Sequence, residues 1–245
     1  MAKYKISTNT GRLLAVAITV ISTATLTANP ASIMLEDFQG YASSPFPAWK
    51  TRGESTATAG KVYRIATENG NRFLRASTAG NPSISIQIAR QVSWNIARHP
   101  LLSWKWRAHR LPAGGNERIG KTNDSAAGIY VLFKRKHIPL ASWAYQPVDI
   151  IKYVWSTNVP RNEIIRKSSR AKMGVTYYRG VFVVLQSGST NLGKWMTEER
   201  NIREDYRRFY GSYPRYNPLA IAVLTDSNDT GSSAAADYDD FTIKR

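Results

Sequence analysis

Short runs of alternating apolar and polar residues recur along the chain and are separated by Gly, Pro, Asn and Ser. Nine of these runs are rich in β-branched and aromatic residues and have the length of strands. Many short strands with turn residues between them are typical of sandwiches and jelly rolls. The sequence therefore predicts an all-β protein, a β-sandwich or jelly roll. The predicted strands are Val62–Ala66, Phe73–Ala76, Ile84–Ile88, Leu101–Arg107, Ala127–Lys134, Asp149–Trp155, Val175–Ser187, Leu219–Thr225 and Tyr238–Lys244.

One segment, Met196–Tyr210, has the periodicity of a helix. Its apolar residues recur every three or four positions, and two of its three charged pairs at i,i+4 attract each other. We expect one amphipathic helix packed on the sandwich, with its charged side chains in solvent. The apolar stripe comprises Ile202, Tyr206, Phe209 and Tyr210, and the pairs are Glu199 with Arg203, Glu204 with Arg208, and Arg203 with Arg207.

The first 28 residues have the pattern of a secretory signal peptide. Three basic residues and no acidic residue accompany the apolar run Leu13–Ile21, which grades into small and hydroxyl-bearing residues. The apolar run is too short to cross a bilayer well, since a spanning helix needs about 20 apolar residues. We expect residues 1–28 to be removed on export to the periplasm or the extracellular space, leaving residues 29–245 as a single β-sandwich domain. An uncleaved segment would instead act as an anchor.

The composition narrows the chemistry that this domain can perform. Basic residues outnumber acidic residues by 34 to 17, and without the predicted signal peptide the chain has 217 residues and a net charge of +14. The chain has no cysteine and three histidines, which excludes thiolate chemistry and a histidine-rich zinc site. Nucleic acid is not an expected partner, because export separates the protein from it and no recognition helix or glycine-rich phosphate loop is evident.

The C-terminal part of the chain is acidic although the whole chain is basic. Five aspartates lie within residues 226–240, which contain no Lys or Arg. The spacing partly matches a calcium loop, but strands rather than EF-hand helices flank it. Two interpretations stay open: a calcium site built from hard oxygen ligands, or a polar hairpin loop with solvated carboxylates. The candidate ligands in this stretch are Asp226, Asn228, Asp229, Asp237 and Asp239.

Alternation along Leu101–Arg107 gives this predicted strand one aromatic and one cationic face. Trp104 and Trp106 lie on one side, with Lys105 and Arg107 on the other. Paired indoles suit stacking on sugar rings, so both tryptophans are candidates for glycan binding. They equally suit the core, because large aromatic side chains dominate the burial energy of a sandwich.

A basic segment, residues 161–172, contains five basic residues and a single acidic residue. We expect a cationic loop in which Arg166, Lys167 and Arg170 attract acidic polysaccharide or anionic lipid headgroups through long-range, salt-sensitive forces. The alternative is a solvated loop without a ligand.

The strand that follows carries a possible uronate-binding set. Alternation predicts that Tyr178 and Gln186 share one face, with Arg179 next to them. Such a set can neutralise a uronate, and a tyrosine hydroxyl can move its proton, as in a polysaccharide lyase. This arrangement loosely resembles the jelly-roll alginate lyases. Their strand with a catalytic histidine between glutamine and isoleucine is missing here, since Gln87 and Ile88 are followed by Ala89.

Three segments together resemble an uncharacterised family of exported bacterial proteins, the domain of unknown function numbered three thousand and forty-seven. The segments are Pro100–Arg107, Asn123–Phe133 and Trp195–Gly231, and the family implies no established activity. More distantly, Glu36–Phe38 and Tyr238–Phe241 are similar to the first and last strands of carbohydrate-binding jelly rolls. In those modules adjacent terminal strands often share a structural calcium, which implies Glu36 and Asp239 as a second possible ligand set.

The sequence thus favours an exported, non-catalytic β-sandwich that binds an anionic glycan of the envelope or extracellular matrix. Two alternatives stay open. One is a polysaccharide lyase or hydrolase, and the other is a structural subunit of a membrane-associated assembly.

Overall fold

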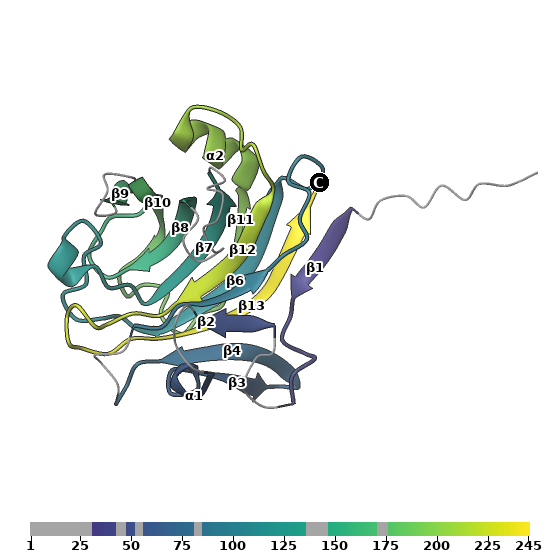
Figure 1. The fold of residues 1–245 in the computed structure, drawn as a ribbon. Coiled ribbons are helices and arrows are strands. Elements are labelled where there is room, and N and C mark those ends of the chain that lie inside the picture. The colour runs from purple at the N-terminus through teal and green to yellow at the C-terminus, as the bar shows by residue number, and fades with distance from the viewer. Residues whose placement is uncertain (1–30, 43–47, 52–55, 81–84, 136–146, 171–175) are drawn as a thin grey trace, which may run out of the picture. The chain divides into compact units, whose positions relative to one another are not determined.

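Two β-sheets face each other across a hydrophobic core in the computed structural model, which describes residues 31–42, 48–51, 56–80, 85–135, 147–170 and 176–245 (Figure 1). The predicted signal peptide, residues 1–28, lies outside these residues. Thirteen strands and two α-helices occur in the described part, which confirms the predicted all-β sandwich with one packed helix. Residues 31–245 form one unit.

The first sheet, sheet A, has six antiparallel strands in the order β11-β6-β13-β4-β3, with β1 paired to β13. The C-terminal strand β13 is central, because strands from three distant parts of the chain pair with it. Only the end of the acidic stretch, including Asp237, Asp239 and Asp240, therefore lies within a sheet. The strands are β1 (Ser32–Glu36), β3 (Tyr63–Glu68), β4 (Asn71–Ser77), β6 (Leu101–Arg110), β11 (Met196–Asn201) and β13 (Ala235–Lys244).

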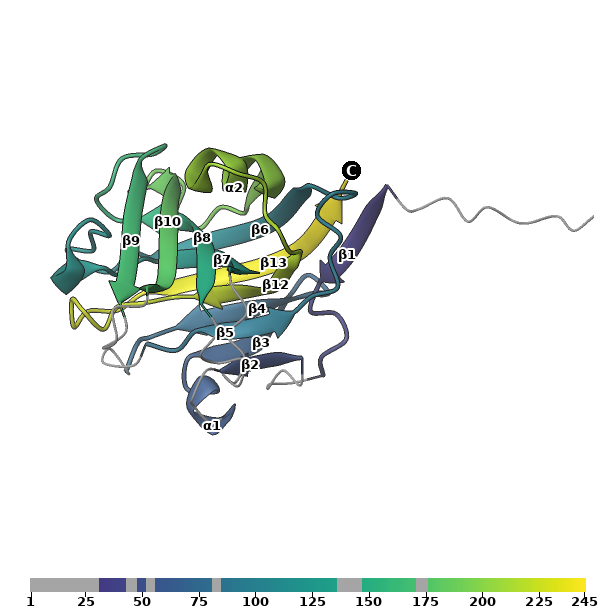
Figure 2. The ribbon, with the colours of Figure 1, turned by 45° about the horizontal axis from the view of Figure 1, so that its top comes forward.

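The second sheet, sheet B, has seven strands in the order β2-β5-β12-β7-β8-β10-β9 (Figure 2). Its pairs are antiparallel except β8 with β10, because β9 leads the chain back to run parallel to β8. The strands are β2 (Trp49–Thr51), β5 (Ile88–Gln91), β7 (Ala127–Lys134), β8 (Val148–Ser156), β9 (Ile164–Arg170), β10 (Thr176–Ser187) and β12 (Pro218–Leu224). The short helices are α1 (Thr56–Ala59) and a 3₁₀ turn (Gly120–Thr122).

Aromatic side chains join the two sheets. The Trp104 ring lies 5.2 Å from that of Tyr153, and the Trp106 ring lies 5.9 Å from that of Trp155. All four side chains have no exposed surface. The predicted alternation of β6 is therefore correct, but it turns Trp104 and Trp106 into the core, so their faces are not a surface for sugars. Replacing either one by Ala should cost about 3–5 kcal/mol.

The predicted helix begins six residues too early. Met196–Asn201 form the edge strand β11, which pairs with β6, and only Ile202–Tyr210 are helical (α2). Asn201 ends the strand and caps the helix, because its side chain accepts a hydrogen bond of 3.0 Å from the Glu204 amide. Gly211, at φ 83°, ends the helix in the left-handed region.

The basic segment predicted as a loop contains strand β9, whose residues pair with β10 from Ile164 to Arg170. Its apolar and polar residues alternate weakly, and the many cations hide the strand pattern. Within the described residues, neither α-helix is long and apolar enough to cross a membrane.

Candidate anion-binding site

A pocket of about 290 Å³ lies where β9 and β10 meet helix α2. Figure 2 shows α2 beside β10 at this end of sheet B. The pocket contains three of the cationic residues predicted to bind an acidic glycan, drawn from two predicted sites. Its lining residues are Arg166, Lys167, Ser168, Arg179, Gly180, Val181, Phe209 and Tyr210.

The strand register decides which cations point into this pocket. Arg166 pairs with Val181 and Ser168 pairs with Arg179, so these four side chains leave the same face of the sheet, toward α2. Arg166 donates a hydrogen bond of 3.0 Å from Nη1 to the carbonyl of Phe209. Lys167 leaves the opposite face, where its Nζ lies 3.4 Å from the carbonyl of Arg118. The pocket is therefore an arginine site.

Arg179 is held in a fixed orientation. Its Nε and Nη2 each donate a hydrogen bond of 2.7 Å to the Asp149 carboxylate, and its guanidinium lies 4.8 Å from the Tyr210 ring centre. The buried Asp149 also accepts a hydrogen bond of 2.7 Å from the Tyr206 hydroxyl. These contacts use both carboxylate oxygens, while 42% of the Arg179 side chain stays exposed.

Two tyrosines of α2 support this arrangement as neutral hydrogen-bond donors. Burial raises the pKa of Tyr210, whose hydroxyl donates to the carbonyl of Ile150 at 2.8 Å. Burial and the Asp149 hydrogen bond raise the pKa of Tyr206 as well. The sequence did not predict a role for Asp149, Tyr206 or Tyr210. The available signal was Asp149, the one acidic residue near the start of the apolar strand β8. A buried carboxylate requires hydrogen-bond donors, so its presence indicates that donors lie nearby.

The arrangement is suited to binding an anion. Two guanidinium groups face the pocket, and the one carboxylate next to them is fully engaged by the protein. Guanidinium groups bind carboxylate, sulfate or phosphate through paired N–H donors. The volume lies near the lower end of the range of about 300–1,000 Å³ for ligand pockets, which suits one charged sugar residue.

The predicted uronate set is not assembled. A β-bulge between Val184 and Gln186 shifts the register by one residue, so Gln186 pairs with Trp155 and faces sheet A. There Gln186 donates a hydrogen bond of 2.7 Å to Glu198. Tyr178 leaves the other face of β10, where its ring lies close to Gly180. The prediction that Tyr178 and Gln186 share a face is wrong. Arg170, the last residue of β9, pairs with Thr176.

The predicted calcium ligands occupy separate places. Glu36 is buried and accepts hydrogen bonds of 2.9–3.0 Å from the Phe38 amide, the Tyr41 hydroxyl and the Trp49 indole. Asp226 follows β12 and is buried, whereas Asn228 and Asp229 lie in the exposed loop beyond it, hydrogen-bonded to each other at 3.3 Å. Asp237 and Asp239 alternate with core residues of β13 and face outward from sheet A.

Cationic side chains surround Asp237. Its carboxylate accepts hydrogen bonds from Arg75 at 2.8 and 3.0 Å and from Arg107 at 2.8 and 3.1 Å, and it lies 2.6 Å from Nε2 of His109. Burial acts to raise its pKa, but the bonds from His109, Arg75 and Arg107 lower it to about 2. Burial raises the pKa of Asp239 to about 6, despite a bond of 2.8 Å from Asn71.

Among the residues that the structure describes, no three acidic or histidine side chains lie close enough to hold one metal ion. Calcium binding stays a prediction. Thermal unfolding of the mature protein in chelator and in millimolar calcium tests it, because an ion that binds only the folded state raises the melting temperature. Coincident curves, with no metal found by elemental analysis, would contradict it.

Solved structures of similar fold include proteins that act on glycans. The family 12 xyloglucanase from Bacillus licheniformis aligns with a TM-score of 0.45 and 10% identity over 88% of this chain and 100% of the other. The family 11 carbohydrate-binding module of a Clostridium thermocellum cellulase aligns with a TM-score of 0.36 and 10% identity, over 89% and 96%. The xyloglucanase domain of NopAA from Sinorhizobium fredii aligns with a TM-score of 0.41 and 11% identity over 83% of this chain and 97% of the other.

No curated protein matches the chain. One family model does, and it covers residues 47–242, which include all the strands of the sandwich except β1 and the end of β13. The resemblance predicted from the three sequence segments is confirmed. The chain belongs to the family described as "Protein of unknown function (DUF3047)".

Proposed function

We propose that this protein is exported and binds an acidic glycan of the envelope or extracellular matrix through the pocket between β9, β10 and α2. One observation carries the proposal. Arg166 and Arg179 point into the same pocket, and Asp149, the carboxylate beside them, is fully engaged by hydrogen bonds. A site with two guanidinium groups and no carboxylate in its lining favours an anionic ligand.

The walls of the pocket favour a sugar acid over a bare ion. Tyr210 lines it beside the two arginines and is partly exposed, whereas Phe209, which also lines it, is 6% exposed. An aromatic wall suits the apolar face of a sugar ring, while guanidinium groups take its carboxylate. The charge of the mature chain, +14, adds a long-range attraction to polyanions that salt weakens.

The lyase alternative has lost the residue pair that favoured it, since Tyr178 and Gln186 leave opposite faces of β10. Binding without turnover is therefore the proposed activity. If incubation with polygalacturonate or alginate produced unsaturated ends that absorb in the ultraviolet, the proposal of binding without turnover would be wrong.

A matched pair of variants on one strand tests the pocket. Arg166→Ser and Lys167→Ser remove the same charge from neighbouring residues whose side chains leave opposite faces of β9. We expect Arg166→Ser to weaken binding of trigalacturonate about tenfold, the loss of one charge-assisted hydrogen bond, and Lys167→Ser to weaken it less than about twofold. Thermal unfolding of both variants checks that the fold is retained.

Equal effects of the two substitutions would show that the direction of the Arg166 side chain does not matter, which would contradict a site built on the two arginines. Binding of anionic lipid vesicles at equal or higher affinity than trigalacturonate, with the same dependence on Arg166, would instead favour the membrane-associated alternative.

A further inference from the structure

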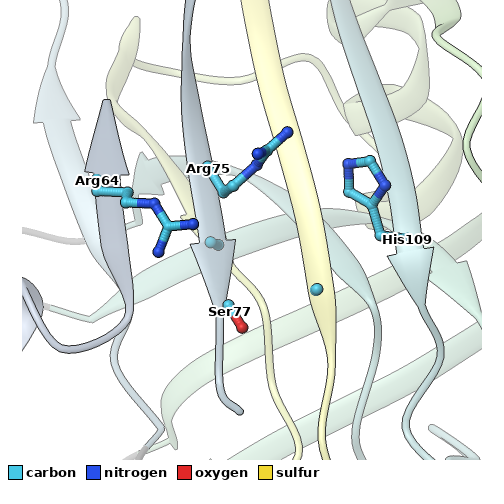
Figure 3. A pocket seen from close by; sticks show the side chains of 6 residues that line it. Arg64, Arg75, Ser77 and His109 are labelled. Atoms are coloured by element: carbon cyan, nitrogen blue, oxygen red, sulfur yellow. The ribbon is translucent and has the colours of Figure 1, made fainter. Parts of the chain in front are cut away.

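A second hollow lies on the outer face of sheet A, across strands β3, β4, β13 and β6 (Figure 3). Its volume is about 220 Å³. Three of the six residues that line it carry nitrogen donors, and none of the six carries a carboxylate. The lining residues are Arg64, Arg75, Ala76, Ser77, His109 and Ala235.

Two arginines lie directly opposite each other at this hollow. Arg64 of β3 pairs with Arg75 of β4, so both side chains leave the outer face of the sheet. Like charges directly opposite each other on neighbouring strands are destabilising. The Arg64 side chain is exposed and makes no hydrogen bond or ion pair with any described residue. An anion between the two guanidinium groups would remove this repulsion.

The other donors are held in place from below by Asp237. Arg75 uses Nε and Nη2 on this carboxylate, which leaves Nη1. His109 contacts the carboxylate through Nε2, so its Nδ1 donates to an anion only when the ring carries both protons. Figure 3 shows the Arg75 and His109 side chains pointing toward each other over β13, with the Arg64 guanidinium directed toward β4. Asp237 itself has no exposed surface, so it orients the donors without facing the hollow.

The local charge stays positive. The guanidinium groups of Arg64, Arg75 and Arg107 outnumber the carboxylates of Asp237 and Glu68, which pairs with Arg107 at 2.6 Å. A ligand that neutralises this excess must be an anion. The hollow is smaller than the range of about 300–1,000 Å³ that encloses a whole small ligand, so it fits a charged group.

We propose that this hollow is a second oxyanion site, which takes a sulfate, phosphate or carboxylate group between Arg64, Arg75 and His109. It lies on sheet A, whereas the Arg166 and Arg179 pocket belongs to sheet B. The protein then holds two anionic groups at once, either on one polymer or on two. This second site does not depend on the first one.

One titration monitors both sites separately. Sodium sulfate is added to the isotope-labelled mature protein at constant ionic strength while backbone amide signals are followed. We expect saturable shifts at Ser77 and His109 for this hollow, and separate shifts at Arg179 and Phe209 for the pocket on sheet B. Shifts at Arg179 and Phe209 without any at Ser77 and His109 would refute the second site and leave the proposed function intact. The reverse result would support the second site alone.

Arg64→Ser supplies the matched test, with Arg98→Ser as its control. Arg98 is also exposed, and its side chain bonds to no described residue. We expect Arg64→Ser to weaken sulfate binding at Ser77 and His109 about tenfold and Arg98→Ser to change it less than about twofold. Neither unfolding midpoint should fall, because removing Arg64 also removes its repulsion from Arg75. Equal effects of the two variants would refute the site. Repeating the titration with free phosphate and with a sulfated oligosaccharide shows which source binds more tightly.

Discussion

Asp237 of sheet A and Lys152 of sheet B are both buried charged side chains, and their surroundings are opposite in kind. Asp237 of sheet A has no exposed surface and receives guanidinium groups and an imidazole directly. Lys152 of sheet B is 1% exposed, and its nearest partners are neutral. Its Nζ donates to the Ser125 hydroxyl at 2.9 Å and lies 5.2 Å from the Tyr130 ring and 4.9 Å from the Phe182 ring.

The pKa values show the consequence of this difference. Direct hydrogen bonds lower the pKa of Asp237 to about 2 although burial opposes them. Burial lowers the pKa of Lys152, and the more distant carboxylates Glu117, Asp226 and Asp124 do not reverse it. Contact between opposite charges therefore overcomes desolvation in sheet A, whereas attraction over a distance does not in sheet B.

Removing Asp237 should have the largest effect, because it leaves two guanidinium groups and an imidazole without their common partner. We expect Asp237→Ala to lower the free energy of unfolding by about 3–5 kcal/mol, as for a broken buried ion pair. Asp240→Ala is the control. Asp240 pairs with Lys105 at 2.8 Å in a partly exposed position, so its loss should cost less than about 1 kcal/mol. Chemical denaturation measures both, and similar losses would contradict the contrast.

Asp226 should make stability depend on pH in the direction opposite to Asp237. Burial raises the pKa of Asp226 from 3.8 to about 6, so the folded state holds its proton more tightly than the unfolded state. Its contribution to stability therefore falls by about 1–3 kcal/mol as pH rises from about 4 through 6. The contribution of Asp237 is instead lost as pH falls from about 4 through 2.

Asp226→Asn should flatten the pH dependence of unfolding between pH 4 and 6 while leaving the acid limb unchanged. Burial also raises the pKa of Asp239 to about 6, so this residue would preserve part of the dependence of stability on pH. If the stability of the variant changed between pH 4 and 6 as much as that of the native protein, Asp226 would not be a source of this pH dependence.

Gly128 makes room for Lys152. A Cβ at position 128 would lie 2.6 Å from Cε of Lys152, which is closer than any real contact. We expect Gly128→Ala to cost about 1–3 kcal/mol through overpacking. In a Lys152→Ala background the cost should largely disappear, and a double-mutant cycle by denaturation measures this coupling. Additive losses would mean that the lysine stem does not occupy this space.

Lys152→Met should have the smallest effect. Methionine keeps most of the packing against Tyr130 and Phe182 but removes a buried amine that has no direct ion pair. The free energy of unfolding should change by less than about 1 kcal/mol, as for other volume-conserving replacements. A loss comparable to that of Asp237→Ala would show that the distant carboxylates stabilise Lys152 more than its contacts indicate.

The sequence predicted the elements whose pattern is local. Alternation in Leu101–Arg107 placed Trp104 and Trp106 correctly on one face, because successive side chains of a regular strand point to opposite faces. The sequence pattern could not show whether residues 196–201 form a strand or the first turns of a longer α2, since the spacing of Glu199 and Arg203 also fits a helix. Pairing of β11 with the distant β6 decides it.

The candidate sites depend on pairings that no local pattern reveals. Asp237 accepts a hydrogen bond from Arg75, which lies 162 positions away in the chain. The sequence shows only the acidic neighbours of Asp237, which suggested a calcium loop, and does not reveal this partner. The bulge after Val184 turned Gln186 to the other face without any glycine or proline to indicate it. Arg166 and Arg179 were both predicted to bind a glycan, but only the β9–β10 register and α2 bring them into one pocket.

Methyl esterification of the ligand tests the proposed function most directly, because it removes the charge of a uronate and keeps the sugar. Trigalacturonate and its fully methyl-esterified form are titrated calorimetrically into the mature protein at low and at physiological salt. The two-arginine pocket predicts that the acid binds at least about tenfold more tightly than the ester, and that added salt narrows the difference. Equal affinities for acid and ester, unaffected by salt, would contradict an anionic glycan as the ligand.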